Sequence, residues 1–310
     1  MAFFLLIRLQ TWKIFLQLYM TTLTMETSSH KLNIAFFGTP EFAVTILDQL
    51  KKNNILPSLI VTAPDKPKGR KLILSAPPVK KWALENTIDI AQPTKLDKDF
   101  VETINAHSWD LFIVAAYGLI IPQNVLDIPH KGSLNVHPSL LPKFRGASPI
   151  ESSILGGATE TGVTIMLIDE KMDHGPLLSQ LIIPMKGDEN ASELEMTLAE
   201  LGGELLAKTI PSWIHGELQE QAQIHDKATF TKKMTKEDGL IDLNDDPTMN
   251  YRKIRAYKIW PGTYFFVEKN GKKIRVIIKD ASIEKEELCI HKVLPEGKKE
   301  MKYEDFLKGL

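Results

Sequence analysis

An amide and an imidazole stand one residue apart, at Asn135 and His137, where an apolar run ends in GSLNVHPSLLPKFRGASPI. On an extended strand such residues point to the same face, so both side chains can act on one group. Further along, Asp173 precedes His174 and a glycine in the turn of IDEKMDHGPL. An amide that stabilises a developing oxyanion, an imidazole that moves a proton and a carboxylate that orients it would make an acyl-transfer site. Taken singly, each residue also fits a structural role.

Two prolines, Pro138 and Pro142, bracket the apolar pair Leu140 and Leu141 in the same segment. Proline fixes φ at about −65°, so the turn that follows the strand is rigid in advance. We expect this turn to hold an apolar wall beside the polar pair, a combination typical of small-molecule pockets.

A scaffold of alternating strands and helices is needed to position these residues, and the sequence predicts one from Asn33 onward. This alternation predicts a Rossmann-like α/β domain, with a mainly parallel sheet and helices on both faces. In such sheets ligands bind beyond the carboxyl ends of the strands, where His137 is expected to lie. The expected strands are 33–38, 56–63, 88–93, 110–118 and an antiparallel pair at 161–169 and 177–185; the expected helices are 40–52, 77–87, 97–107, 148–155 and 192–216.

The turn after the first expected strand argues against a dinucleotide cofactor. It reads GTPEFA, with Gly38 as its one glycine and the acidic Glu41 close behind. A pyrophosphate needs a glycine-rich turn that lets the backbone approach, and a carboxylate at the start of the helix would repel it. We therefore expect a Rossmann-like fold that does not bind NAD.

The chain divides into segments of different texture. Residues 31–216 form the expected catalytic domain, 217–233 a polar linker, and 234–310 a small β-rich domain with a hairpin turn at Asn270-Gly271. The first 30 residues make a poor membrane span and a poor secretory signal. We predict residues 1–30 to be a dispensable leader, with a surface amphipathic helix or membrane attachment as the alternatives.

Composition narrows the function classes. The 310 residues have a net charge of −1, so any contact with nucleic acid must come from a local patch. One such region is 251–302, with 14 Lys and Arg against 7 Asp and Glu. A single cysteine, Cys289, excludes an intramolecular disulfide framework and a CxxC site. We expect a cytoplasmic monomer with no bound metal and no stable membrane partner.

A series of segments runs from Asn33 to the C-terminus: FFGTPEFAV, VTAPDKPKGR, PPVK, AAYGLIIP, GSLNVHPSLLPKFRGASPI, TGVTIMLIDEKMDHGPLL, IRAYKIWPGTY and LPEGKKEM. In content and order the series resembles the methionyl-tRNA formyltransferases. The Asn-x-His…SLLP…RG block alone is shared with the wider folate-dependent formyltransferases, which include glycinamide ribonucleotide and sugar-amine enzymes. The PDKPKGRK, WPGTY and PEGKK segments narrow the resemblance to the tRNA enzymes.

The resemblance implies transfer of the formyl group of 10-formyltetrahydrofolate to the amino group of methionine on initiator tRNA. It implies that Asn135, His137 and Asp173 are the catalytic residues. The residues implied to bind folate are Ser139, Leu140, Leu141, Pro142, Tyr117 and Gly118. Those implied to contact tRNA are Lys66, Arg70, Lys71, Lys272, Lys273 and Lys298.

The sequence departs from the family pattern in two places. The family loop often reads GRGKK, whereas here Lys71 is followed by Leu72 and Ile73. The C-terminal domain is shorter than usual, so we expect a trimmed, OB-like barrel.

Two other functions remain open. A sugar-amine formyltransferase would share the chemistry but would need neither the basic segment at Arg70 nor a basic C-terminal domain. A catalytically silent tRNA- or folate-binding module would be expected to lack one of the three polar residues, and all three are present.

Overall fold

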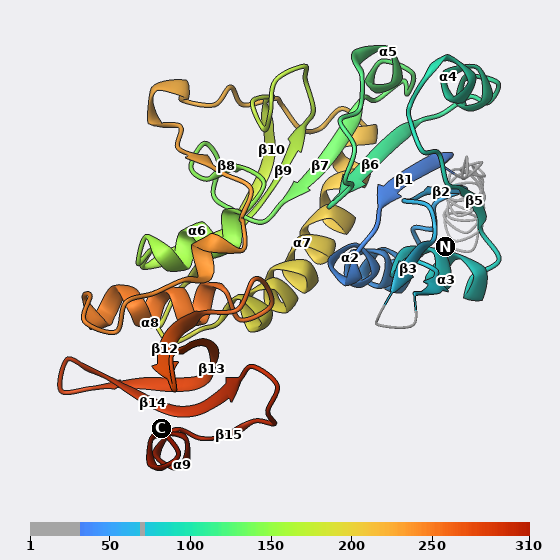
Figure 1. Cartoon of the computed structure of the whole chain (residues 1–310). Helices are drawn as coiled ribbons and strands as arrows, with labels where there is room; N and C mark the ends of the chain where they lie inside the picture. The colour runs from blue at the N-terminus through green and yellow to red at the C-terminus, as the bar shows by residue number, and fades with distance from the viewer. Residues whose placement is uncertain (1–31, 69–71) are drawn as a thin grey trace, which may run out of the picture. The chain divides into compact units, whose positions relative to one another are not determined.

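The sheet that positions the site runs through the N-terminal half of the computed structural model, which describes residues 32–68 and 72–310 (Figure 1). Residues 33–310 form one compact unit. The predictions made for residues 1–30, Arg70 and Lys71 lie outside the described residues.

The sheet has seven strands in the order β10-β9-β7-β6-β1-β2-β5. From β5 to β7 all neighbours are parallel, whereas β9 is antiparallel to β7 and β10 is antiparallel to β9. The predicted α/β class and the predicted antiparallel pair are both confirmed. The strands are β1 (Ile34–Gly38), β2 (Leu59–Val61), β5 (Asp89–Ala91), β6 (Leu111–Ala115), β7 (Ser133–His137), β9 (Glu160–Leu167) and β10 (Leu177–Pro184).

The central strands are buried on both faces, as parallel strands usually are. In β1, Ala35 and Phe37 pack with Phe100 and Phe112 on one face, and the alternate Phe36 is equally buried. Helices lie against the sheet: α2 (Glu41–Lys52), α3 (Pro78–Glu85), α4 (Lys98–Asn105), α5 (Gln123–Leu126) and α7 (Ala191–Ile214) (Figure 1). Helix α6 (Pro149–Leu155) instead packs against α7.

Helix α7 packs against α2 and directly behind the strand that carries the polar pair. A capping box between Asn190 and Glu193 defines its start. A Cβ at Gly203 would lie 2.6 Å from Gln49 Cβ on α2, and one at Gly202 would lie 2.9 Å from Val136 on β7. The adjacent glycines therefore let the helix approach both neighbours closely, and β7 is supported from behind.

Several elements are shorter than predicted, for local reasons. The strand expected over 88–93 ends at Ala91, two residues before Pro93, because proline cannot donate to a strand ladder. The helix expected to reach 216 ends at Ile214, and Gly216 adopts φ 74° just beyond it.

The basic segment after β2 is a two-stranded ribbon rather than a plain loop, with β3 (Lys66–Lys68) antiparallel to β4 (Ile73–Ser75).

Residues 234–310, called the second domain below, contain the expected antiparallel sheet. Asn270 and Gly271 both have positive φ, as the predicted hairpin turn requires. The described strands pair as an open meander rather than a closed barrel, in the order β12 (Tyr264–Lys269), β13 (Lys272–Glu284), β14 (Glu287–Pro295) and β15 (Met301–Lys302).

The second domain also contains helices that the sequence analysis missed. Helix α8 (Pro247–Ala256) begins at Asp246, whose side chain accepts a hydrogen bond from the Thr248 N–H, with Pro247 in the first turn. An Asp-Pro pair also fits the start of a turn, so this helix start is not distinctive in the sequence. Shorter helices are η2 (Glu237–Gly239) and α9 (Tyr303–Lys308). Among the described residues, no helix is both long enough and apolar enough to span a bilayer.

The segment predicted as a linker, 217–233, is attached by hydrogen bonds to the preceding domain, called the first domain below. Its residues 221–231, called the strap below, begin with two main-chain hydrogen bonds between Gln221 and Leu177. They continue through η1 (His225–Lys227) to β11 (Phe230–Thr231), which runs parallel to β8 (Arg145–Gly146). The low hydrophobicity of this predicted linker is consistent with its contacts, which are mainly polar hydrogen bonds.

Candidate active site

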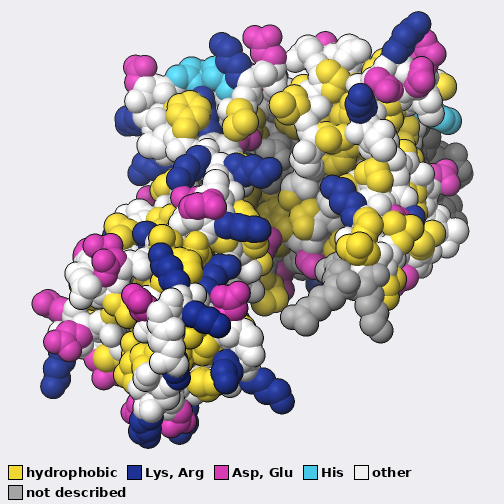
Figure 2. All heavy atoms as spheres, in the orientation of Figure 1, with side chains coloured by type: hydrophobic (Ala, Val, Ile, Leu, Met, Phe, Trp, Pro, Cys, Tyr) yellow, Lys and Arg dark blue, Asp and Glu magenta, His cyan; other side chains and the backbone are white. Residues whose placement is uncertain are grey.

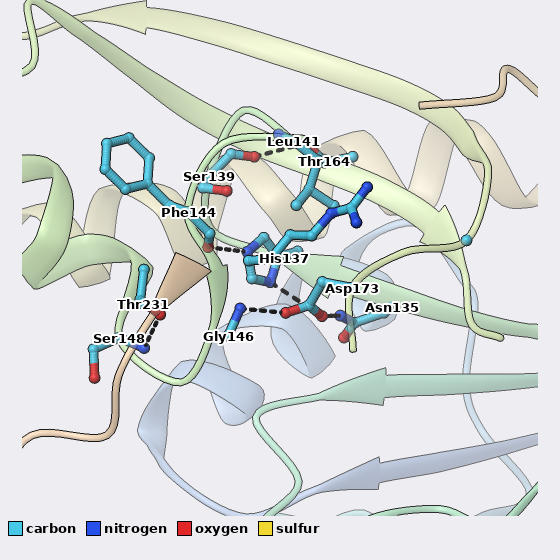
Figure 3. Close-up of polar contacts among 12 residues, drawn as sticks. Asn135, His137, Ser139, Leu141, Phe144, Gly146, Ser148, Thr164, Asp173 and Thr231 are labelled. Carbon is cyan, nitrogen blue, oxygen red and sulfur yellow. Dashed lines mark hydrogen bonds and ion pairs between the residues drawn. The ribbon is translucent and has the colours of Figure 1, made fainter. Parts of the chain in front are cut away.

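Strand β7 ends with Asn135 and His137, whose side chains share one face at the carboxyl edge of the sheet. Asp173 lies in the loop between β9 and β10, and because β9 is antiparallel to β7 this loop returns to the same edge. Figure 3 shows the three side chains pointing toward one another. In Figure 2 the visible face of the first domain is hollowed, with hydrophobic side chains in the depression.

The carboxylate of Asp173 is the centre of this group. Its Oδ1 lies 3.6 Å from His137 Nδ1 and 3.5 Å from Asn135 Nδ2. Its Oδ2 accepts a hydrogen bond of 2.7 Å from the Gly146 N–H (Figure 3). The main-chain hydrogen bond fixes Oδ2, and Oδ1 therefore faces the imidazole of His137 and the amide of Asn135.

The imidazole of His137 is buried, with only 4% of the residue exposed. Its Nε2 lies 3.1 Å from the carbonyl oxygen of Phe144, while its Nδ1 faces Asp173. Both ring nitrogens thus face oxygen acceptors, and only the imidazolium carries a proton on each nitrogen. A proton on either nitrogen would therefore have an oxygen acceptor within reach.

Backbone conformation fixes the carboxylate from two sides. Asp173 adopts φ 50°, a left-handed conformation that aspartate tolerates better than most residues. Gly146 adopts φ 112°, and a Cβ there would lie 2.6 Å from the Thr231 carbonyl oxygen. Glycine is required at this position because the chain needs both the unusual angle and the close approach of the strap.

The turn after β7 is held from behind by a buried hydroxyl. Thr164 Oγ1 donates to the Ser139 carbonyl at 2.6 Å and accepts from the Leu141 N–H at 3.2 Å. Gln180 Nε2 adds bonds to Thr164 Oγ1 and to the Leu141 carbonyl. Two neighbouring strands, β9 through Thr164 and β10 through Gln180, therefore fix the turn between the two prolines.

The residues predicted to bind folate differ in exposure. Ser139 and Leu141 are buried, with Leu141 packed on Met166 and Leu177, whereas Leu140 and Pro142 are partly exposed. Only the latter two therefore present appreciable surface in this structure. The pocket role of all four stays a prediction.

Tyr117 and Gly118, also predicted to bind folate, follow β6. The Tyr117 ring packs edge-on against Phe37 at 5.5 Å between centroids. Its hydroxyl is buried without a hydrogen-bond partner, and burial raises the pKa of Tyr117 to about 12. Gly118 is exposed.

The basic ribbon is anchored at its base. Asp65 accepts hydrogen bonds from Lys80 and from Gln92, and the contact with Gln92, followed by that with Lys80, lowers the pKa of Asp65. This contact joins the PDKP and PPVK segments in space. Lys66 is exposed on β3.

The other predicted tRNA contacts lie on the second domain. Lys272, Lys273 and Lys298 are exposed, and Lys273 Nζ lies 4.4 Å from the centre of the Phe266 ring. Figure 2 shows Lys and Arg side chains interspersed with Asp and Glu over the visible face of this domain.

Sequence reasoning missed the polar residues that support the loops. Arg145 stood in the quoted motif without a role, and Gln223 and Thr229 stood in the supposed linker. The Phe144 N–H donates to Thr229 Oγ1 at 2.8 Å, and the Arg145 N–H donates to the Thr229 carbonyl. Partners so far apart along the chain leave no local pattern, although an arginine in a core turn is a signal that a buried acceptor exists.

A charged cavity of about 490 Å³ lies away from these residues. It is formed where the start of α7 meets α8 and β13, and Arg255 and Lys258 are among its lining residues. None of the predicted site residues lines it. Within the described part of the chain, no group of three or more His, Cys, Asp or Glu side chains is arranged to hold a metal ion.

Comparisons with known proteins identify the family. Residues 32–210 match the formyl transferase family, and residues 233–287 match the formyl transferase C-terminal domain. A methionyl-tRNA formyltransferase of Halalkalibacterium halodurans is 37% identical over 306 residues, covering 90% of this chain and 95% of that protein. One of Chloroflexus aurantiacus is 42% identical over 247 residues, covering 79% of each chain.

Solved structures show the same fold at greater distance. WlaRD, a sugar 3N-formyl transferase crystallised in the presence of dTDP and 5-N-formyl-THF, aligns with a TM-score of 0.56 at 22% identity. The alignment covers 82% of this chain and 88% of that one.

Proposed function

Because the chain belongs to the methionyl-tRNA formyltransferase family, we propose that it transfers the formyl group of 10-formyltetrahydrofolate to the amino group of methionyl initiator tRNA. The observation that carries the proposal is the convergence of Asn135, His137 and Asp173 at the carboxyl edge of the sheet. Relatives named for this reaction span most of the chain, including the second domain.

The reaction forms a bond between the amino nitrogen and the formyl carbon and breaks the bond between that carbon and the folate nitrogen. An α-amino group has a pKa of ~8, so an appreciable neutral fraction can attack without a strong base. Negative charge develops on the formyl oxygen, for which the Asn135 amide is a suitable donor. The attacking nitrogen loses one proton as the amide forms, and the departing folate nitrogen gains one, so no net proton is consumed.

His137 is suited to supply that proton. Its two nitrogens face the Phe144 carbonyl and the Asp173 carboxylate, so a ring protonated on both nitrogens would have an acceptor for each proton. Asp173 orients the ring, and Gly146 in turn orients Asp173. His137 is buried and the side chain of Asp173 is only 15% exposed, and this limited contact with water strengthens the attraction between a protonated ring and the carboxylate.

The donor and tRNA contacts are part of the proposal. The partly exposed Leu140 and Pro142 supply apolar surface next to His137 for the pterin, while the buried Ser139 and Leu141 hold the turn. We assign Lys66, Arg70 and Lys71 to the acceptor end of the tRNA, and Lys272, Lys273 and Lys298 to its phosphate backbone. Backbone contacts of this kind supply affinity rather than sequence specificity.

A direct assay tests the proposal. The purified protein is incubated with 10-formyltetrahydrofolate and either methionyl initiator tRNA or methionyl elongator tRNA, and formylmethionine is measured. Fast formylation of the initiator over the elongator is expected. A dTDP-linked amino sugar is the third acceptor, and formylation of that sugar alone would replace the tRNA function with the sugar-amine one.

A further inference from the structure

Two buried polar side chains behind the catalytic carboxylate have no part in the chemistry described above. Gln223 belongs to the strap and Arg145 to the turn after β7, and they are only 5% and 3% exposed. Burying an amide and a guanidinium is unfavourable unless both are well bonded. Their hydrogen bonds therefore indicate what they hold in place.

The amide of Gln223 spans the loop that carries Asp173. Its Nε2 donates to the Asp173 carbonyl at 2.9 Å and to the Gly175 carbonyl at 2.7 Å. Its Oε1 accepts from Arg145 Nη2 at 2.6 Å and from Arg145 Nε at 3.2 Å. The amide orientation is unambiguous, because the reverse would place oxygen against two carbonyls and NH₂ against a guanidinium.

Arg145 connects the amide to the other loop of the site. Its neighbour Gly146 donates the main-chain hydrogen bond to Asp173 Oδ2. The contacts therefore close a ring, in which the carboxylate of Asp173 is held through Gly146 and its main chain is held through Gln223. The two sets of contacts are joined because Gly146, which bonds the carboxylate, directly follows Arg145, which bonds Gln223.

The strap keeps Arg145 in this position. Arg145 Nη2 lies 2.9 Å from Nδ1 of His225, whose ring stacks on His174 at 4.1 Å between centroids. Burial, followed by the neighbouring charges of His174 and Arg145, holds the pKa of His225 below its ordinary value, so the neutral ring can accept from Arg145. Nδ1 of His174 lies in turn 2.6 Å from Asp169 Oδ2.

We propose that Gln223 is a positioning residue for formyl transfer: its amide fixes the left-handed turn at Asp173, so that the carboxylate faces His137. The proposal rests on the function proposed above and adds a residue from outside the catalytic domain's sequence motifs. Gln223 touches no reacting atom and acts through Asp173. Since a displacement of about 1 Å can lower turnover roughly 100-fold, loss of the amide should reduce kcat.

Two substitutions separate the contacts that Gln223 makes. Gln223→Met keeps the length of the side chain and removes all four hydrogen bonds. Gln223→Glu keeps an acceptor for Arg145 but turns a carboxylate oxygen toward two carbonyl oxygens. The matched control is Gln219→Met, at an exposed glutamine four positions earlier in the chain.

For both Gln223 variants we expect kcat to fall roughly 10- to 100-fold, with KM for methionyl-tRNA and for 10-formyltetrahydrofolate nearly unchanged. The control should keep the wild-type kcat. Wild-type kcat in both Gln223 variants would overturn the proposal, and so would a loss confined to KM. Absence of formylation by the wild-type protein would instead overturn the proposed function.

A second measurement is independent of activity. The Gly146 amide resonance, observed by NMR in labelled full-length protein, reports on the hydrogen bond to Asp173 Oδ2. We expect it to move in Gln223→Glu toward its position in Asp173→Ala, where the acceptor is gone. An unmoved Gly146 resonance in the folded Gln223→Glu protein would show that the carboxylate does not depend on the amide, whatever the rate.

Discussion

The main-chain N–H of Gly146 holds one oxygen of Asp173 at 2.7 Å and leaves the other oxygen to face His137 and Asn135. The carboxylate is therefore divided between a structural contact and a proposed catalytic one. A substitution can remove the second contact and spare the first.

Asp173→Asn makes that separation. The amide oxygen can replace Oδ2 at Gly146, which turns the NH₂ toward the donors of His137 and Asn135. We expect turnover to fall roughly 100-fold or more, because His137 loses the carboxylate that orients its ring for proton transfer. Far-UV circular dichroism should match wild type. Asp99→Asn, at an exposed position on α4, is the control, and normal turnover by Asp173→Asn would contradict the proton transfer described here.

Asn135→Ala tests the amide as a donor to the developing oxyanion. Removing one such donor typically lowers kcat ~10²–10³-fold, and we expect a loss of this size with little change in KM. Asn135→Asp offers a harsher comparison, since a second carboxylate would then lie about 3.5 Å from Asp173. Steady-state kinetics that gave Asn135→Ala a loss below tenfold would remove the amide from the mechanism.

Thr164→Val tests the support of the turn after β7. The change keeps the shape of the side chain but leaves the Ser139 carbonyl and the Leu141 N–H without the hydroxyl that bonds both. Each unsatisfied buried group costs about 1–3 kcal/mol, so urea unfolding should show a loss in that range or above. Thr164→Ser retains the hydroxyl and should be affected much less. Equal stability of the two variants would contradict this role.

Glu151, on α6, gives a pH-dependent prediction. Burial raises the pKa of Glu151, and the nearby Glu195 raises it further, against a lowering by its own main-chain N–H. A carboxyl group with a raised folded-state pKa stabilises the fold most when protonated, and that contribution is lost as pH rises through the folded pKa. Glu151→Gln should therefore increase the free energy of unfolding at pH 7.

The gain from Glu151→Gln should shrink as pH falls toward the ordinary value of 4.5 and vanish below it. Urea unfolding at pH 7 and pH 4 measures the difference. The exposed Glu200→Gln on α7 is the control. A stabilisation that persisted unchanged at pH 4 would have a cause other than ionisation.

Lys273→Ala tests the second domain as a binder of the tRNA backbone. If Lys273 neutralises one phosphate, its removal weakens tRNA binding and lowers the slope of log K against log salt by about 1. Filter binding at several salt concentrations measures this. Lys98→Ala, on α4 of the first domain, should leave the slope alone. An unchanged slope for Lys273→Ala would place the tRNA on another face.

The α/β fold and the candidate residues Asn135, His137 and Asp173 could be predicted from the sequence for a physical reason. Buried parallel strands are near-continuous apolar runs, and Asn135 and His137 stand out because they interrupt the end of one. Gln223 was missed because its partners, Asp173 and Arg145, lie far away in the chain. Helix α8 was missed because its Asp-Pro start also fits a turn. Long-range polar contacts follow from the fold rather than from any local pattern.

The strap limits where this chain can be divided. A fragment that stopped after α7 would retain the whole seven-stranded sheet and all three polar residues, yet it would expose the loop edges that β11 and Thr229 now cover. Arg145 would lose Gln223 and His225, its hydrogen-bond partners on the strap. Any fragment of the first domain that folds on its own must therefore extend at least through Thr231. The boundary between the two domains lies after the strap, because the strap supports the active site.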